Sequence, residues 1–412
     1  MANKLTYSIT SGLSGTAVQK RSGHHDVGVN TSDAFARAYQ LQCAGKFHRA
    51  AQAYLELIRN EPKNASALNN FGNCLRSIGQ FEKSIRCFDQ ALAIDPGKCS
   101  SRLNRGLALL ALDRYREAWP DYETRLETIS YRSELLQQQD RKWKGQSLGA
   151  NSVLYLYSSQ GLGDELQCLR FVPIAAARVA KVILELQKPT AALVSGLPKN
   201  VTVIQRGEKV PSFDQWAELF SLPGIFDIGV DTLPMPVRPI YTPDLRVKSF
   251  IESEGSLIPN QLKIGLVWSG NPDNSLNSVR ACGLAHLKPL LQIPNCKFYS
   301  LQLGKPAVEI AQQGLSDEVE DLSPFLGDFG STATAIDTLD LVISTDTSVP
   351  HLAGTLGAET WLMLQEPADW RWGQSGDDSA WYPSLRLFRQ TLMGNWAEVV
   401  ERVASALLKR AS

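Results

Sequence analysis

Four polar residues and a histidine, set between two apolar runs, form the stretch of this sequence best suited to chemistry. Thr345, Asp346, Thr347 and Ser348 come first, and His351 follows. Ser348 or Thr347 can cap a helix, and the free N–H groups at a helix start attract anions. These residue types indicate a site for an anionic group beside Asp346 and His351.

The flanking residues predict the elements that hold this loop. Leu341 to Ser344 is a short apolar run with β-branched residues, typical of a strand buried in a parallel sheet. Pro350 is tolerated in the first turn of the next helix, Gly357 ends that helix, and Thr360 to Leu364 predicts another strand. Ligands bind such units at the carboxyl ends of the strands, where this loop lies.

A glycine-rich loop follows another predicted strand, Val153 to Ser158. Gly161 and Gly163 allow the backbone to turn tightly and to approach a ligand. Asp164 is predicted at the N-cap of a helix running to about Val179, a position where aspartate is favoured.

Predicted strands and helices alternate both around the glycine-rich loop and in the part of the chain that contains Asp346. The remaining predicted strands are 181–186, 201–204, 263–269 and 297–303, and Asp328 begins the helix before the central strand. Gln302 can bond a nucleobase or ribose, or serve as a cap. Trp370, with Trp372 and Trp381, can stack on a sugar or base, or pack against the fold.

Before these regions the chain repeats with a period of 34 residues, the tetratricopeptide period. Small residues recur where two helices would touch, glycine or aspartate recurs at the turn, and aromatic residues recur between the helices: Ala38, Gly72 and Gly106; Gly45, Gly79 and Asp113; Tyr54, Phe88 and Tyr122. Three units predict an all-α solenoid with a groove for a peptide or protein. A rigid spacer or dimerisation arm is the alternative.

The central stretch resembles the ADP-heptose–lipopolysaccharide heptosyltransferases, bacterial glycosyltransferases of the GT-B architecture. Their last domain carries a similar Asp-Thr-Gly-x-x-His signature, which Asp346, Thr347 and His351 match, whereas Ser348 replaces the glycine. More distantly, the chain is similar to tetratricopeptide-linked O-GlcNAc transferases.

Three further motifs resemble relatives in which tetratricopeptides precede such a domain. Their Glu-Gln-Gly-Leu-Gly-Asp appears here with Ser159 in place of the glutamate. Their Trp-x-Gly-Asn-Pro…Arg covers Ser269, Gly270 and Arg280, and their Asp-Trp-Arg-Trp…Trp-Tyr-Pro…Arg-Leu-Phe-Arg covers 369–389.

This resemblance implies an inverting, metal-independent glycosyltransferase with a nucleotide-sugar as co-substrate and no cofactor. Asp164 would be the catalytic base that takes the proton of the acceptor hydroxyl. Arg280 and the Thr345–His351 loop would hold the donor diphosphate, with His351 and helix N–H groups on the leaving phosphate. A helix cap at Asp164 and a solvated surface arginine at Arg280 stay open as alternatives.

The expected organisation is α plus α/β: a tail over 1–31, three tetratricopeptide units and a capping helix over 32–145, and two Rossmann-like domains over 150–245 and 260–412. The capping helix is expected within Tyr131 to Trp143. The repeats would recruit a protein acceptor or a protein partner. The rival hypothesis is an interaction scaffold with a vestigial transferase region, favoured by Ser159 and Ser348.

Composition excludes several other classes. Lys plus Arg and Asp plus Glu both number 42, so no broad basic surface for nucleic acid is expected. No apolar run reaches the roughly 18 residues of a membrane span, and the N-terminus lacks a secretory core. Seven scattered cysteines fit reduced thiols in cytoplasm. No GxGxxG follows a strand, which disfavours a dinucleotide-dependent oxidoreductase.

Overall fold

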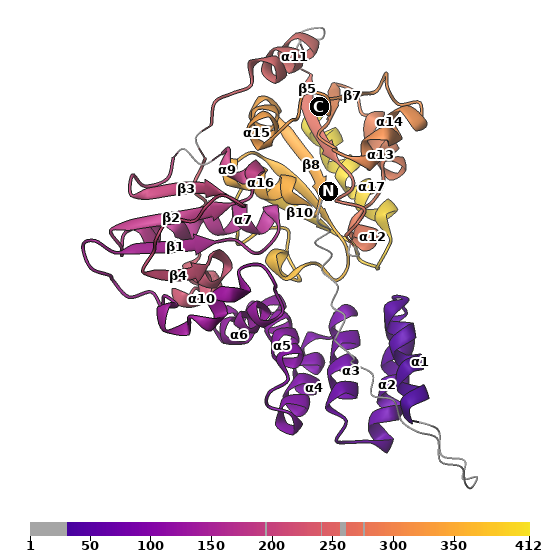
Figure 1. The fold of residues 1–412 in the computed structure, drawn as a ribbon. Helices are drawn as coiled ribbons and strands as arrows, with labels where there is room; N and C mark the ends of the chain where they lie inside the picture. The colour runs from indigo at the N-terminus through magenta and orange to yellow at the C-terminus, as the bar shows by residue number, and fades with distance from the viewer. Residues whose placement is uncertain (1–30, 194–195, 240, 256–260, 275–276) are drawn as a thin grey trace.

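The computed structural model describes residues 31–193, 196–239, 241–255, 261–274 and 277–412 (Figure 1). The tail predicted over 1–31 therefore lies almost wholly outside the described residues. The helical arm occupies the lower part of Figure 1, the first parallel sheet lies above it, and the second sheet lies beside the first.

The arm consists of six helices that pack as antiparallel pairs: α1 (Thr31–Cys43), α2 (Phe47–Asn60), α3 (Ala65–Ser77), α4 (Phe81–Ile94), α5 (Cys99–Ala111) and α6 (Tyr115–Tyr122). The predicted small residues do lie where helices touch, because a Cβ on Gly72 would come within 2.6 Å of the Phe88 ring. The turns within the pairs have left-handed backbone at Gly45 and Gly79, and Asp113 takes the same conformation with a φ of 59°.

The predicted capping helix within Tyr131 to Trp143 is wrong. Residues 123–141 instead form the 3₁₀ turns η1 (Glu123–Glu127), η2 (Ser133–Gln137) and η3 (Gln139–Arg141). The segment follows the outer face of the first sheet, where Tyr131 and Leu135 pack with Tyr155 and Trp216. Lys142 then pairs in parallel with Trp216, so the segment ends as an extended edge.

The first sheet has four parallel strands in the order β3-β2-β1-β4. These strands are β1 (Val153–Tyr157), β2 (Lys181–Leu186), β3 (Val201–Gln205) and β4 (Gln215–Glu218). Short helices and turns connect them: α7 (Leu162–Cys168), η4 (Leu169–Phe171), α8 (Val172–Ala176), α9 (Lys188–Ala191), η5 (Leu219–Ser221), α10 (Leu222–Ile225) and η6 (Val230–Thr232). The first three strands match the predicted segments to within one residue.

The second sheet has six parallel strands in the order β10-β9-β8-β5-β6-β7. They are β5 (Leu262–Val267), β6 (Cys296–Ser300), β7 (Val319–Asp321), β8 (Leu341–Thr345), β9 (Thr360–Leu364) and β10 (Leu385–Arg389). The surrounding helices are α11 (Leu245–Gly255), α12 (Asn277–Arg280), α13 (Leu284–Leu291), η7 (Lys305–Val308), α14 (Glu309–Gln312), α15 (Phe329–Thr338), α16 (Ser348–Leu356), η8 (Trp370–Trp372) and α17 (Trp396–Ala411).

In each sheet the direction of the strand order changes between two neighbouring strands. Ligands are expected to bind at this position. In the second sheet the order runs outward in both directions from the neighbours β5 and β8, and in the first from β1 and β4. A crevice at the carboxyl ends of the strands forms at such a reversal. The glycine-rich loop follows β1, and the loops carrying Arg280 and Asp346 follow β5 and β8.

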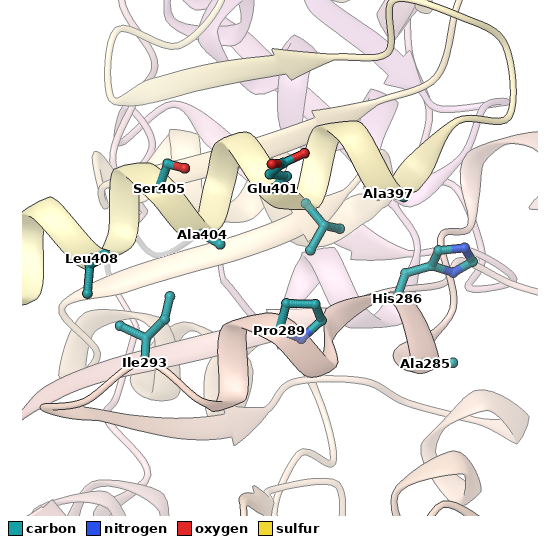
Figure 2. Close-up of a pocket in the computed structure, with 10 residues that line it drawn as sticks. Ala285, His286, Pro289, Ile293, Ala397, Glu401, Ala404, Ser405 and Leu408 are labelled. Carbon is teal, nitrogen blue, oxygen red and sulfur yellow. The ribbon is translucent and has the colours of Figure 1, made fainter.

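One continuous buried core joins the arm to both sheets. It runs from Tyr115 and Trp119 of the arm through Leu154 and Leu156 of β1 to Leu352 of α16. A separate core fills the opposite face of the second sheet, under α13 and α17. Figure 2 shows a groove outside that layer, between Pro289 of α13 and Ile293 just after it on one side and Ala404 and Leu408 of α17 on the other.

Candidate functional site at the junction of the two sheets

The loops at the strand reversal of the second sheet lie close together, as the sequence predicts. Thr347 is the N-cap of α16, and its hydroxyl accepts a hydrogen bond of 3.2 Å from the Val349 amide. Pro350 lies in the first turn, and Gly357 ends the helix with a φ of 73°. Across the reversal, a Cβ on Gly270 would contact Thr347 at 3.7 Å.

Most polar side chains of these loops form hydrogen bonds with other residues of the same loops and so hold the loops in place. The Gln302 side-chain oxygen accepts from the amides of Trp268 and Ser269, and its nitrogen donates to the Ser269 carbonyl at 2.9 Å. The amide therefore ties the end of β6 to the loop after β5. Asn277 bonds Ser269 and the Gly270 amide in the same way. Thr345 is fully buried, and its hydroxyl has no partner among the described residues.

Asp164 is not the N-cap of its helix, which corrects the expectation from the sequence. The helix α7 begins two residues earlier, with Gly161 as the extended N-cap and Asp164 in the first turn. The Asp164 carboxylate reaches back and accepts a hydrogen bond of 3.0 Å from the Gly161 amide. The single helix expected up to about Val179 is divided into α7, which ends at Cys168, the 3₁₀ turn η4, and α8, which ends at Ala176.

Arg371, a residue that the sequence analysis did not single out, connects the two sheets. Its Nη2 donates to Asp164 Oδ1 at 2.5 Å, its Nη1 to Asp369 Oδ1 at 2.8 Å, and its Nε to Gln167 at 2.9 Å. The guanidinium also stacks on Trp370, 4.5 Å from the ring centre. Arg371 belongs to the Asp-Trp-Arg-Trp motif together with its partner Asp369, so a signal was present, but Asp164 and Gln167 lie in another part of the chain.

Charges of alternating sign run across the junction. From Asp164 and Arg371 the row continues to Asp369, then to Arg280, whose Nη2 lies 3.0 Å from Asp369, and then to Asp346, 3.5 Å from Arg280 Nε. Burial works against the charge of Asp369, but Arg371 and Arg280 outweigh it and lower the pKa of Asp369 to about 2. Burial raises the pKa of Asp346.

His351 lies between the two sheets as a buried, neutral side chain. Its Nδ1 is 3.0 Å from the Tyr382 hydroxyl, and its ring stacks on Trp372. Burial, reinforced by Arg371, lowers the pKa of His351 to about 3. The side chain is therefore neutral near pH 7, and it can act on a phosphate only as a neutral hydrogen-bond donor.

The contact between His351 and Gly163 gives a direct prediction for the interface between the sheets. A Cβ on Gly163 would lie 2.7 Å from His351 Cδ2. We expect Gly163→Ala to push α7 away from α16 and to lower the free energy of unfolding by about 1–3 kcal/mol. Urea unfolding measures this loss. Gly149→Ala is the control, because a Cβ there meets nothing within 4 Å; equal stability of the two variants would contradict the contact.

The structure assigns Trp370 to packing rather than to a sugar or base. Its side chain is 5% exposed and lies among Tyr115, Trp119 and Tyr122 of the arm. Phe220 and Trp381 complete this cluster of rings. Trp372 and Trp381 are buried as well. The expected stacking role of Trp370 is therefore replaced by an anchoring role between the arm and both sheets.

The described part of the chain contains neither a cluster of metal ligands nor a membrane-spanning helix. There, no group of three or more His, Cys, Asp or Glu side chains is arranged to hold a metal ion. No helix among the same residues is both long and apolar enough to cross a bilayer.

Comparison with known proteins identifies the repeats. A tetratricopeptide repeat model matches residues 35–98. The chain is 25% identical over 389 residues to Protein FlbA of Caulobacter vibrioides, covering 85% of this chain and 63% of FlbA. The chain thus spans less than two thirds of that relative. A 65-residue stretch is 34% identical to the STIP1 homolog of Dictyostelium discoideum, covering 16% of this chain and 12% of that protein.

Solved structures of tetratricopeptide domains are similar to a part of this chain. The second tetratricopeptide domain of human RPAP3, in complex with an HSP70 peptide, is 26% identical, covers 23% of this chain and 78% of that domain, and has a TM-score of 0.22. The N-terminal helices are thus tetratricopeptide repeats, and two parallel sheets follow them.

Proposed function

We propose that this protein is a glycosyltransferase of the GT-B architecture that moves a sugar from a nucleotide-sugar to an acceptor hydroxyl with inversion. One observation carries the proposal: the loops of Arg280 and Asp346 flank the strand reversal of the second sheet, and Asp164 reaches the same place from the first.

The proposed chemistry divides between the two sheets. The acceptor hydroxyl attacks the anomeric carbon as Asp164 takes its proton, and the bond from that carbon to the diphosphate oxygen breaks. The electron pair leaves with the phosphate, beside Arg280 and the free amides at the start of α16. The Asp164 side chain is 21% exposed, which leaves room for a hydroxyl to approach it.

The repeat arm would supply the protein-binding part of this function. Tetratricopeptide stacks bind partners in their concave groove. Amide side chains of neighbouring repeats are already bonded to one another here: Asn104 and Ser101 of α5 both donate to Asn69 of α3. These buried bonds hold neighbouring repeats together, and the stack would offer its groove to an extended peptide, either as the sugar acceptor or as a partner that brings the acceptor.

The alternative is an interaction scaffold whose transferase half no longer turns over. Arg280 and Arg371 are each already paired with two carboxylates, so a diphosphate would have to compete with Asp346 and Asp369. Two family positions are also changed. Ser159 replaces the expected glutamate and donates a hydrogen bond to Glu218, and Ser348 replaces the expected glycine.

Nucleotide binding separates the two functions. We expect one nucleoside diphosphate, or its sugar, to raise the melting temperature of the wild type, since a ligand at 100 times its Kd adds about 2.7 kcal/mol of stability. Arg280→Met should lose this shift, because the phosphate loses its guanidinium. Arg386→Met, at an exposed position on β10, is the control. A panel of nucleotides without any shift would favour the scaffold.

A further inference from the structure

The repeat arm places a third arginine beside the junction. Arg76 lies in the last turn of α3, half-buried, and its Nη2 donates to the Asn73 side chain at 3.2 Å. Its Nε is buried and has no hydrogen-bond partner among the described residues. A buried guanidinium donor left unpaired costs free energy, so its retention needs a reason.

Two turns of the arm fix where this arginine lies. The turn that follows Arg76 approaches the loop after β9, because a Cβ on Gly79 would lie 3.7 Å from Glu366 Oε1. The corresponding turn of the next repeat approaches the other end of the loop, where Gly373 faces Asp113. Asp369, the centre of the row of charges, lies between these two contacts in the chain.

The electrostatics agree with this placement. Burial lowers the pKa of Arg76, and the nearby Asp369 carboxylate partly offsets that effect. Arg105 and Arg114 of the arm, by contrast, pair with carboxylates of the arm itself, Arg105 with Asp121 and Asp89 and Arg114 with Glu117. Within the described residues Arg76 has no carboxylate within 4 Å.

We propose that Arg76 is a phosphate-binding residue that the repeat arm contributes to the junction, where it acts together with Arg280 and Arg371. This inference rests on the proposed function and names a contact of the same site. Arg280 and Arg371 both pair with Asp369, and the contacts at Gly79 and Gly373 bring the turn that follows Arg76 to the same loop. Guanidinium forks match phosphate oxygens in pairs, and a diphosphate offers enough oxygens for several such donors.

The arm is then part of the catalytic unit. Because the aromatic cluster around Trp370 holds α5 and α6 against both sheets, α3 keeps a fixed position relative to Arg280. A donor diphosphate would contact both the arm and the loops of the second sheet. Binding of a nucleotide would therefore depend on the arm, even though no nucleotide motif lies within the repeats.

The test is a calorimetric titration of the full chain with inorganic pyrophosphate and with the nucleoside diphosphates of the panel. Arg76→Met should weaken pyrophosphate and nucleoside diphosphate binding roughly 10- to 100-fold, the range for a charged hydrogen bond. Binding of the matching nucleoside, which lacks phosphate, should stay unchanged. Arg86→Met, at an exposed position of α4 in the same repeat, should bind as the wild type does.

The outcomes separate this inference from the proposed function. If Arg280→Met loses binding while Arg76→Met binds as tightly as the wild type, the role of Arg76 is overturned and the transferase stands. If the wild type binds neither pyrophosphate nor any nucleotide, both fall. Circular dichroism checks folding. Should Arg76→Met fold poorly, Arg76→Lys decides, because lysine keeps the charge but loses the forked contact and should still bind at least several-fold more weakly.

Discussion

Replacing Asp164 by asparagine is expected to lower the turnover of a nucleotide-sugar by a factor of about 10²–10⁴, the range for loss of a general base. Asparagine has nearly the same shape, and its side-chain oxygen can still accept the hydrogen bond from the Gly161 amide. Arg371 would remain held by Asp369 and Gln167. The variant should therefore fold and bind the nucleotide with the affinity of the wild type.

Slow hydrolysis of the nucleotide-sugar provides a readout that needs no identified acceptor. Release of the nucleoside diphosphate is followed for the wild type, for Asp164→Asn and for Asp317→Asn, which changes an exposed aspartate far from the junction in sequence. The control should match the wild type. Unchanged turnover in Asp164→Asn would remove this residue from the chemistry, and loss of nucleotide binding in the same variant would make its role structural.

Trp370→Ala is expected to have the largest effect on stability, about 3–5 kcal/mol, as for other buried tryptophans. The side chain packs on Tyr115, Trp119 and Tyr122 of the arm and on Phe220, which follows β4. Its loss leaves a cavity where the arm and both sheets meet. We therefore expect the arm to detach as well as the fold to weaken.

The matched control is Trp361→Ala, which removes an equally buried indole from the separate core of the second sheet. Both variants should lose stability in urea. Only Trp370→Ala should expose the segment 123–141 to protease below the unfolding transition and increase the radius of gyration in X-ray scattering. Equal proteolysis of the two variants would show that Trp370 does not anchor the arm.

Local patterns predicted much of the fold correctly because they act over a few residues. Runs of apolar and β-branched residues identified β1, β2 and β8, and hydroxyl and glycine chemistry placed the start of α16 at Thr347 or Ser348 and its end at Gly357. The 34-residue repeat identified the arm for the same reason. Each of these signals depends on a single strand, a single cap or a single helix pair.

The errors occur where distant segments decide the outcome. The sequence predicts Asp164 as an N-cap, but the N-cap of α7 is Gly161, and Asp164 lies in the first turn. Its carboxylate pairs with Arg371, which lies 207 positions later in the chain. The sequence allows Trp370 either to stack on a ligand or to pack against the fold, and in the structure it packs against Tyr115 of the arm. The segment 123–141 follows a sheet face rather than its own helical tendency. No local pattern contains these partners.

A nucleotide bound at the strand reversal of the second sheet should protect the backbone amides of the surrounding loops. Hydrogen–deuterium exchange measures this protection loop by loop. The wild type is compared with and without the nucleoside diphosphate that gives the largest thermal shift. We expect the nucleotide to slow exchange in residues 268–274 and 345–351, which flank the reversal, and in the loop around Asp369. Protection confined to the groove of the arm, with no change in these loops, would contradict nucleotide binding at the reversal.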